Sequence, residues 1–211
     1  MSDANDANND VFDHHGGFPK FTAAEQTENF GPFVEQMRQL QDLAVSVNPP
    51  DEVFAEARAL TQKLVDLLEP HQVPEGQQPA GRIIELPGRG SLLMLPWQVE
   101  RFDEDGVRAS GVFRRYHLGG NGAAHGGVLP LAFDDVFGMV VHASGRPISR
   151  TAFLHINYRA VTPLNTKLTV EGRLDRVEGR KSFVSARMTD EAGKLIADCD
   201  ALMVQLLPGQ P

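Results

Sequence analysis

The sequence lacks several features that would place it in common classes of protein. It contains one cysteine, Cys199, so no intrachain disulfide can form. No apolar run reaches the roughly 18 residues that a membrane-spanning helix needs. The first residues are acidic and polar, whereas a secretory signal starts basic and continues apolar. These absences favour a cytoplasmic protein without a membrane span, in which Cys199 is expected to be a small core residue.

Positive charge is scarce in the first part of the chain. Residues 1–80 contain 14 acidic and 4 basic residues, a net charge of −10, whereas residues 81–211 contain 14 acidic and 16 basic residues, a net charge of +2. Affinity for nucleic acid comes largely from basic side chains that face phosphates, so no nucleic-acid partner is expected. The second part retains enough positive charge to bind an anionic ligand.

Several catalytic motifs are also missing. There is no G-x-S-x-G nucleophile turn, no Walker phosphate loop and no H-E-x-x-H zinc motif. The adjacent pair His14-His15 lies in a polar acidic segment, where histidines are expected to be solvated rather than bound to a metal. No metal site and no resident cofactor are therefore expected.

Composition divides the chain into three parts. Residues 1–20 are predicted to be a disordered acidic tail, residues 21–80 a helical extension with a linker, and residues 81–211 the main domain. Apolar residues at helical spacing predict helices over 32–47 and 51–69. Because their apolar stripes must be buried somewhere, we expect both helices to pack on the sheet of the main domain or on a partner subunit.

The main domain reads as strands around one buried helix. Strands are predicted over 92–102 and 107–116, then a helix over 126–143 that is apolar nearly all round, with Pro130 in its first turn. Four strands over 151–159, 167–175, 182–189 and 195–206 follow with short links, which predicts an antiparallel meander. In the first of these four, the apolar set is Ala152, Leu154, Ile156 and Tyr158. The predicted fold class is α+β, an antiparallel sheet wrapped around a central helix.

Two acidic residues interrupt the buried helix. Asp134 and Asp135 point about 100° apart, so at most one of them faces a given cavity. A carboxylate in an apolar setting is costly unless it is paired, hydrogen-bonded or wet. Either one of them is a catalytic group, or one caps a neighbouring loop while the other reaches solvent.

The segment His125-Gly126-Gly127 stands where the buried helix begins. Backbone N–H groups at a helix N-terminus lack helical partners and lie at the positive end of the dipole, and glycines allow another molecule to approach closely. This arrangement suits a developing oxyanion. The alternative is a tight turn that needs glycine, with His125 as an ordinary polar neighbour.

Taken in order along residues 90–207, these motifs resemble the hotdog-fold acyl-CoA thioesterases, in the group of the phenylacetate-pathway thioesterases and nearest to the thioesterase superfamily member four type. The residues that carry the resemblance are Gly122-Ala123-Ala124-His125-Gly126-Gly127-Val128, Asp134, Thr151, Asn157-Tyr158-Arg159, Pro163-Leu164 and Leu174-Asp175-Arg176-Val177-Glu178-Gly179-Arg180-Lys181.

The resemblance implies a role for each matching residue. Asp134 corresponds to the catalytic carboxylate, as general base or nucleophile, and Gly126 to the glycine whose N–H binds the thioester oxygen. His125 flanks that oxygen, and Thr151 orients water or the carboxylate. Some relatives carry an asparagine six positions before the histidine, where this chain has Gly119.

Further ligand contacts and the assembly are expected on the same basis. Gly127 and the nearby Asn121 are candidate substrate-binding residues. Arg159, Arg180 and Lys181 are candidates for the phosphates of coenzyme A, the alternative being solvated charges at strand ends. The expected partners are an acyl-CoA substrate and further copies of the chain, in a homodimer or tetramer with the site between subunits.

Two other functions remain open at this point. A hotdog hydratase or dehydratase would resemble a pattern of Asp, then Asn-Pro, then His, and the only Asn-Pro here is Asn48-Pro49. A catalytically silent acyl-CoA-binding module is the other alternative. Asp134 argues against it, because a binder has no need for an acid in an apolar helix.

Overall fold

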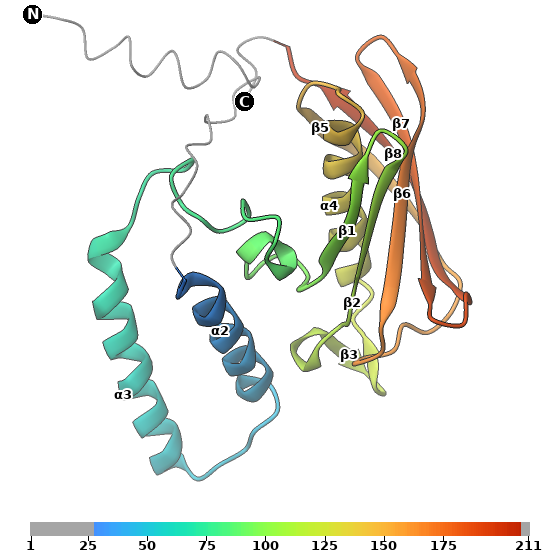
Figure 1. Ribbon diagram of the computed structural model, residues 1–211. Coiled ribbons are helices and arrows are strands. Elements are labelled where there is room, and N and C mark those ends of the chain that lie inside the picture. The colour runs from blue at the N-terminus through green and yellow to red at the C-terminus, as the bar shows by residue number, and fades with distance from the viewer. Residues whose placement is uncertain (1–27, 208–211) are drawn as a thin grey trace, which may run out of the picture.

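Six antiparallel strands form one sheet that curves around helix α4 in the computed structural model, which describes residues 28–207 (Figure 1). The expected disordered tail and the His14-His15 pair lie outside the described residues. The elements are α2 (Phe30–Ala44), α3 (Asp51–Leu68), η1 (Glu69–His71), η2 (Pro87–Gly90), β1 (Gln98–Asp103), β2 (Gly106–Gly111), η3 (Arg115–His117), β3 (Leu118–Gly120), β4 (Ala123–Ala124), α4 (Val128–Ala143), β5 (Ser149–Tyr158), β6 (Leu168–Glu178), β7 (Lys181–Asp190) and β8 (Leu195–Gln205).

The predicted central helix is confirmed. Helix α4 contacts every strand of the large sheet, and its buried side chains include Phe133 and Phe137, both fully inaccessible. Pro130 is the third residue of the helix, within the first turn, where no intrahelical N–H is lost. The helix crosses β6 so closely that a Cβ at Gly172 would lie 2.6 Å from Val136 Cγ1. The α+β hotdog prediction is therefore correct, and close helix–sheet packing requires glycine at that crossing.

The predicted meander is wrong in one respect. The strand order is β1-β2-β6-β7-β8-β5, so β6 pairs with β2, and β5 pairs with β8 at the far edge. Residues 159–167 therefore cross between non-adjacent strands instead of forming a hairpin. Within this crossing Pro163 bridges to Ala123. Strand β5 is consequently an edge strand of the sheet.

The alternation predicted for β5 also needs correction. Its expected apolar face consists of Ala152, Leu154, Ile156 and Tyr158. Leu154 and Ile156 do pack against the core, and Tyr158 on the same side is exposed but contacts Gly126 just before α4. Ala152, in contrast, is exposed and does not continue this face. The register shifts between Thr151 and Phe153, which is the signature of a bulge, and one additional residue reverses the alternation. Thr151 therefore shares the α4-facing side with Leu154.

The first two strands are shorter than predicted. Strand β1 begins at Gln98 and β2 ends at Gly111, because Trp97, the residue just before β1, packs against the last residue of β2. Trp97 is buried against Gly111 and donates through its indole N–H to the carbonyl of Val112 at 3.2 Å. Cys199 is a core residue as expected, and burial raises the pKa of its thiol to about 12.

The N-terminal helices do not pack on the sheet. Helix α2 contacts the η2 and η3 segments, and its buried residues are Val34 and Arg38. Arg38 donates to the carbonyls of Pro87 and Ser91 at 2.8 and 2.9 Å. Helix α3 has no buried residue. The prediction of sheet packing is wrong because α2 docks on η2 and η3 instead, and packing on a partner subunit stays a prediction. Among residues 28–207, no helix is long and apolar enough to cross a membrane.

Candidate active site

Asp134 and Thr151 are brought together by α4 and β5. The Thr151 hydroxyl donates to Asp134 Oδ1 at 2.6 Å, and Thr151 Oγ1 also lies 3.4 Å from Met203 Sδ. The bulge in β5 makes this contact possible, because strict alternation from Leu154 would turn Thr151 to the other face. Asp134 is only partly buried, and its Oδ2 has no hydrogen-bond partner within residues 28–207. One carboxylate oxygen is thus oriented by Thr151 while the other is available to a ligand or water.

Asp135, in contrast, has a structural role in an ion pair with Arg89. Arg89 binds its carboxylate with two hydrogen bonds, from Nη1 to Oδ2 at 2.9 Å and from Nη2 to Oδ1 at 2.5 Å. Arg89 adopts a left-handed backbone conformation, with φ of 53°, and also donates to the carbonyl of Gly81. The alternative in which one acid ties down a neighbouring segment therefore describes Asp135.

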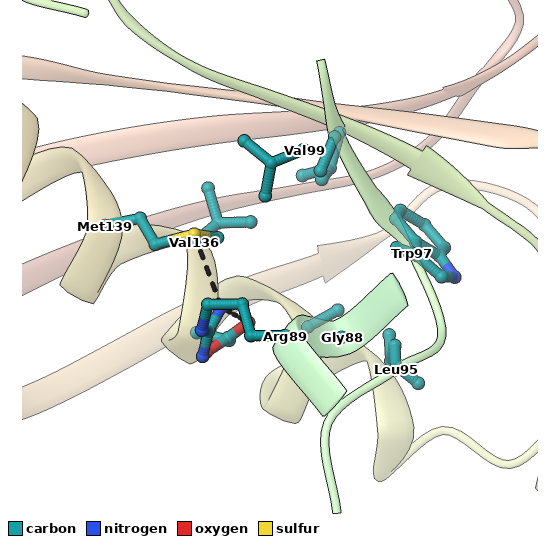
Figure 2. Close-up of a pocket in the computed structure, with 11 residues that line it drawn as sticks. Gly88, Arg89, Leu95, Trp97, Val99, Val136 and Met139 are labelled. Carbon is teal, nitrogen blue, oxygen red and sulfur yellow. Dashed lines mark hydrogen bonds and ion pairs between the residues drawn. The ribbon is translucent and has the colours of Figure 1, made fainter. Parts of the chain in front are cut away.

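A small pocket lies on the Asp135 side of α4. Figure 2 shows Arg89 extending toward Met139 across this pocket, with Trp97 and Val99 on the opposite wall. Its lining includes no residue of the His125 turn, and neither Asp134 nor Thr151. The pocket is therefore separate from the candidate catalytic carboxylate.

The turn before α4 uses most of its N–H groups internally. The N–H of Gly127 donates to His125 Nδ1 at 3.0 Å, that of Val128 to the His125 carbonyl at 3.0 Å, and that of Leu129 to the Gly126 carbonyl at 3.4 Å. The N–H of Gly126 makes no such bond to any residue in the described part of the chain. Several unpaired N–H donors were expected in this turn, but only the N–H of Gly126 is without a partner among the described residues. The N–H of Gly127 is bound to the His125 ring.

The hydrogen bond to Nδ1 determines which nitrogen of the neutral His125 ring carries the proton. A nitrogen that accepts an N–H is unprotonated, so the neutral ring has its proton on Nε2. His125 is exposed, and Nε2–H is therefore a second donor beside the Gly126 N–H. Both groups can donate to a carbonyl oxygen placed at the N-terminus of α4.

Three contacts position this turn. The N–H of His125 donates to the His117 carbonyl at 2.7 Å, and the Tyr158 hydroxyl donates to the Gly126 carbonyl at 3.0 Å. A Cβ at Gly119 would lie 2.6 Å from His125 Cα, so only glycine permits this approach. An asparagine at position 119 is thus sterically excluded in this conformation, and the site contains no counterpart of that residue. Tyr158 was not predicted as a site residue, although the matching motif contains it.

Helix α2 stabilises the segment that contacts His125. Arg114 binds Glu35 at 2.7 Å and Asp42 at 2.8 Å, and Asp42 also accepts the N–H of Tyr116 at 3.1 Å. His117 follows directly and accepts the N–H of Arg114 through Nδ1 at 2.9 Å. The N-terminal extension is thereby linked through these ion pairs to the candidate oxyanion site. No local sequence pattern signals this link.

We expect the protein to become less stable as pH is lowered, because His117 becomes protonated in the unfolded chain before it does in the folded protein. Burial lowers the pKa of His117 from 6.5 to about 4, and only 7% of the residue is exposed. Between these two values the unfolded chain binds a proton that the folded protein excludes, so stability is complete above 6.5 and decreases as pH falls toward 4. The loss between about pH 7.5 and pH 5 should be about 2 kcal/mol, measured by urea unfolding.

The matched variant for this measurement is His117→Asn. Its amide oxygen can accept the Arg114 N–H in place of Nδ1, but it does not titrate. The variant should therefore lose most of this pH dependence. If the variant loses as much unfolding free energy between the two pH values as the wild type does, the effect belongs to other groups.

The candidate phosphate ligands lie apart from these groups in one chain. Arg159 is paired with Asp198, with Nε 2.6 Å from Oδ2, and Arg180 donates to the Gln205 carbonyl at 3.0 Å. Lys181 is exposed and aligns in register with Val204, whereas the neighbouring buried Ser182 aligns with Met203. Lys181 therefore lies on the sheet face opposite Thr151.

Asn121 occupies the turn between β3 and β4. It is exposed and has a left-handed backbone with φ of 49°, a conformation that asparagine tolerates better than most residues. The structure brings it into no hydrogen bond with the residues described. Its visible role is in the turn.

Comparison with known proteins supports the resemblance. Residues 121–197, which contain His125, Asp134 and Thr151, match the model of the thioesterase superfamily. The acyl-coenzyme A thioesterase THEM4 of Rattus norvegicus is 38% identical over 98 residues, which is 45% of this chain and 41% of the relative. The THEM4 of Mus musculus is 34% identical over 97 residues, with the same coverage. The chain thus matches less than half the length of these curated relatives.

A solved structure extends the similarity of fold. A crystal structure described as a thioesterase superfamily protein superposes with a TM-score of 0.73 at 21% identity, over 90% of this chain and 97% of that chain. The overlap is too long to be confined to the hotdog sheet, so it includes N-terminal residues as well. The match over residues 121–197 confirms the resemblance to thioesterases in that part of the sequence, and the solved structure confirms the fold.

Proposed function

We propose that this chain, whose residues 121–197 match the thioesterase superfamily, hydrolyses acyl-CoA thioesters to a free acid and coenzyme A. The observation that carries the proposal is the Asp134–Thr151 pair, which leaves one carboxylate oxygen of the apolar helix α4 without a hydrogen-bond partner among residues 28–207. The similarity to proteins named acyl-coenzyme A thioesterase supports the choice of substrate. No cofactor beyond the coenzyme A of the substrate enters the reaction.

The chemistry follows from two groups. Asp134 Oδ2 takes a proton from water, and the resulting hydroxide attacks the thioester carbonyl carbon; alternatively the carboxylate attacks directly and water hydrolyses the anhydride. The developing oxyanion accepts hydrogen bonds from the Gly126 N–H and His125 Nε2–H. The carbon–sulfur bond then breaks, and the thiolate leaves and takes up a proton. Because a thiolate is a good leaving group, no strong general acid is required.

One copy of the chain does not place both groups at the same carbonyl. Gly126 and Asp134 are eight positions apart, which along a helix corresponds to about 12 Å. A carbonyl group needs its oxygen near the donor and its carbon near the water, within a few ångströms of each other. The distance therefore favours a site made from two subunits.

The contacts of β5 indicate how such a site would form. Thr151 contacts Asp134 near the start of the strand, and Tyr158 contacts Gly126 at its end. Strand β5 is an edge strand of 10 residues, and such edges are normally paired or covered. A two-fold axis through its middle would pair two β5 strands and bring Asp134 toward Gly126 of the partner subunit. We therefore propose a homodimer through β5 as the catalytic unit.

A thiol-release assay on a panel of acyl-CoAs tests the function. We expect turnover with at least one chain length, measured by trapping free coenzyme A with a chromogenic disulfide. The purified Asp134→Asn variant serves as the control for contaminating thioesterases. Binding of acyl-CoA without release by either protein would overturn the proposal in favour of a silent binding module.

A further inference from the structure

Among residues 28–207, no other part of the chain buries helix α3. None of its 18 residues is buried, and its large apolar residues other than Leu64 are exposed, for example Leu60 at 58% and Leu67 at 65%. Figure 1 shows the helix standing apart from the sheet. A single helix of this length is only marginally stable in water without burial of its apolar face. Another surface is needed to cover it.

Five apolar residues of α3 have the spacing of a helix–helix seam. Val53, Ala57, Leu60, Leu64 and Leu67 follow one another at intervals of four, three, four and three residues. This is the a/d pattern of a heptad repeat, which places all five on one stripe. The stripe therefore fits a second helix of similar length better than a flat sheet.

We propose that α3 pairs in antiparallel orientation with α3 of a second copy of this chain. In the register where Ala57 faces Leu60 of the partner subunit, Glu56 lies beside Lys63 of the partner subunit. The two-fold axis repeats this ion pair, so Glu56 and Lys63 of each copy both face a residue of opposite charge. Helix α3 is thus complementary in charge to itself.

Other arrangements lack this match. A parallel pair would place Glu56 beside Thr61 of the partner subunit and leave both charges unpaired. The antiparallel register one heptad further would bring Lys63 against Lys63 of the partner subunit. The charge pattern of α3 therefore selects the antiparallel register centred between Ala57 and Leu60.

The charges of the helix also disfavour a lipid surface as the occupant. Helix α3 contains four acidic residues and two basic residues, a net charge of −2. Helices that lie on membranes have polar faces rich in lysine and arginine, which anionic lipids attract. A second copy of α3 is favoured over a membrane on this ground.

This interface is distinct from the proposed pairing of β5. It uses a different element and needs its own two-fold axis, so both together would join two dimers into a larger assembly. The inference does not rest on the proposed function. It can fail while thioesterase activity persists, and the reverse is also true.

Leu60→Glu tests the interface, because it introduces like charges at the centre of the seam. We expect the mass from light scattering at micromolar concentration to fall by half, with circular dichroism as the check on folding. The matched control is Ala55→Glu, which adds the same charge to the opposite face of the helix and should leave the mass unchanged. The reversed pair Glu56→Lys with Lys63→Glu should also retain the wild-type mass, whereas either change alone should weaken the assembly.

A disulfide provides a second, independent readout. The double variant Val53→Cys with Leu64→Cys should crosslink two chains on mild oxidation, because the register places these positions opposite each other. The two residues are eleven positions apart in one helix and cannot bond to each other, and Cys199 is buried. The control variant Ala55→Cys with Gln62→Cys should not crosslink. Absence of the Val53–Leu64 crosslink, with unchanged mass in Leu60→Glu, overturns the proposal and assigns the cover of α3 to another surface.

Discussion

Asp134→Asn should lower kcat for acyl-CoA hydrolysis by about 10²–10⁴, the usual contribution of acid–base catalysis. The amide retains the shape of the side chain, and its oxygen can still accept the Thr151 hydroxyl at the 2.6 Å contact. It cannot take a proton from water or attack a carbonyl. Binding of acyl-CoA should therefore survive, measured by calorimetry with a non-hydrolysable analogue. Thr151→Ala should cause an intermediate loss, because it leaves the carboxylate but removes its orientation.

The neighbouring acid is the internal control. Asp135→Asn breaks the paired hydrogen bonds with Arg89, whose side chain is 19% exposed, and should reduce stability by about 1–2 kcal/mol. Its kcat in the folded protein should remain near that of the wild type. The opposite pattern, with Asp135→Asn inactive and Asp134→Asn active, would contradict the assignment of the catalytic carboxylate.

Two inactive variants should restore each other when they are expressed together. Gly126→Pro removes the one N–H in the turn that has no partner among the described residues, and should reduce kcat by about 10²–10³. Gly126→Ala retains the N–H, and its Cβ would lie at an ordinary 3.8 Å from the Tyr158 ring, so it should lose less. A heterodimer of Asp134→Asn with Gly126→Pro contains one intact site if each site combines Asp134 of one subunit with Gly126 of the other.

The size of the recovery distinguishes the two models. Random mixing makes half of the dimers mixed, with one of two sites intact, so activity should recover to about a quarter of the wild-type level. Sites within single chains would always contain one lesion and would show no recovery. Separately purified variants mixed without exchange of subunits provide the baseline.

The local pattern of the sequence was sufficient for most of the secondary structure. The apolar helix around Phe133 could be predicted because a helix that is buried on all sides has apolar residues at nearly every consecutive position. The His125-Gly126-Gly127 turn and Asp134 were found for the same reason, since glycines and an acid interrupt an otherwise apolar run. The amphipathic helices α2 and α3 were predicted with ends within a few residues of those observed.

What the sequence by itself determined, then, was the central helix, the order of the strands along the chain and the candidate groups for chemistry. The tertiary structure alone decided which of those groups meet. Thr151 contacts Asp134, 17 residues away in the sequence, because of the bulge in β5. Arg89 binds Asp135 at a separation of 46 residues, and Asp42 binds Arg114 at a separation of 72 residues. The position of β5 at the sheet edge was likewise decided by pairing between distant strands. Periodicity reports only which faces are buried, whereas these contacts depend on how faces that are far apart in the chain pack together.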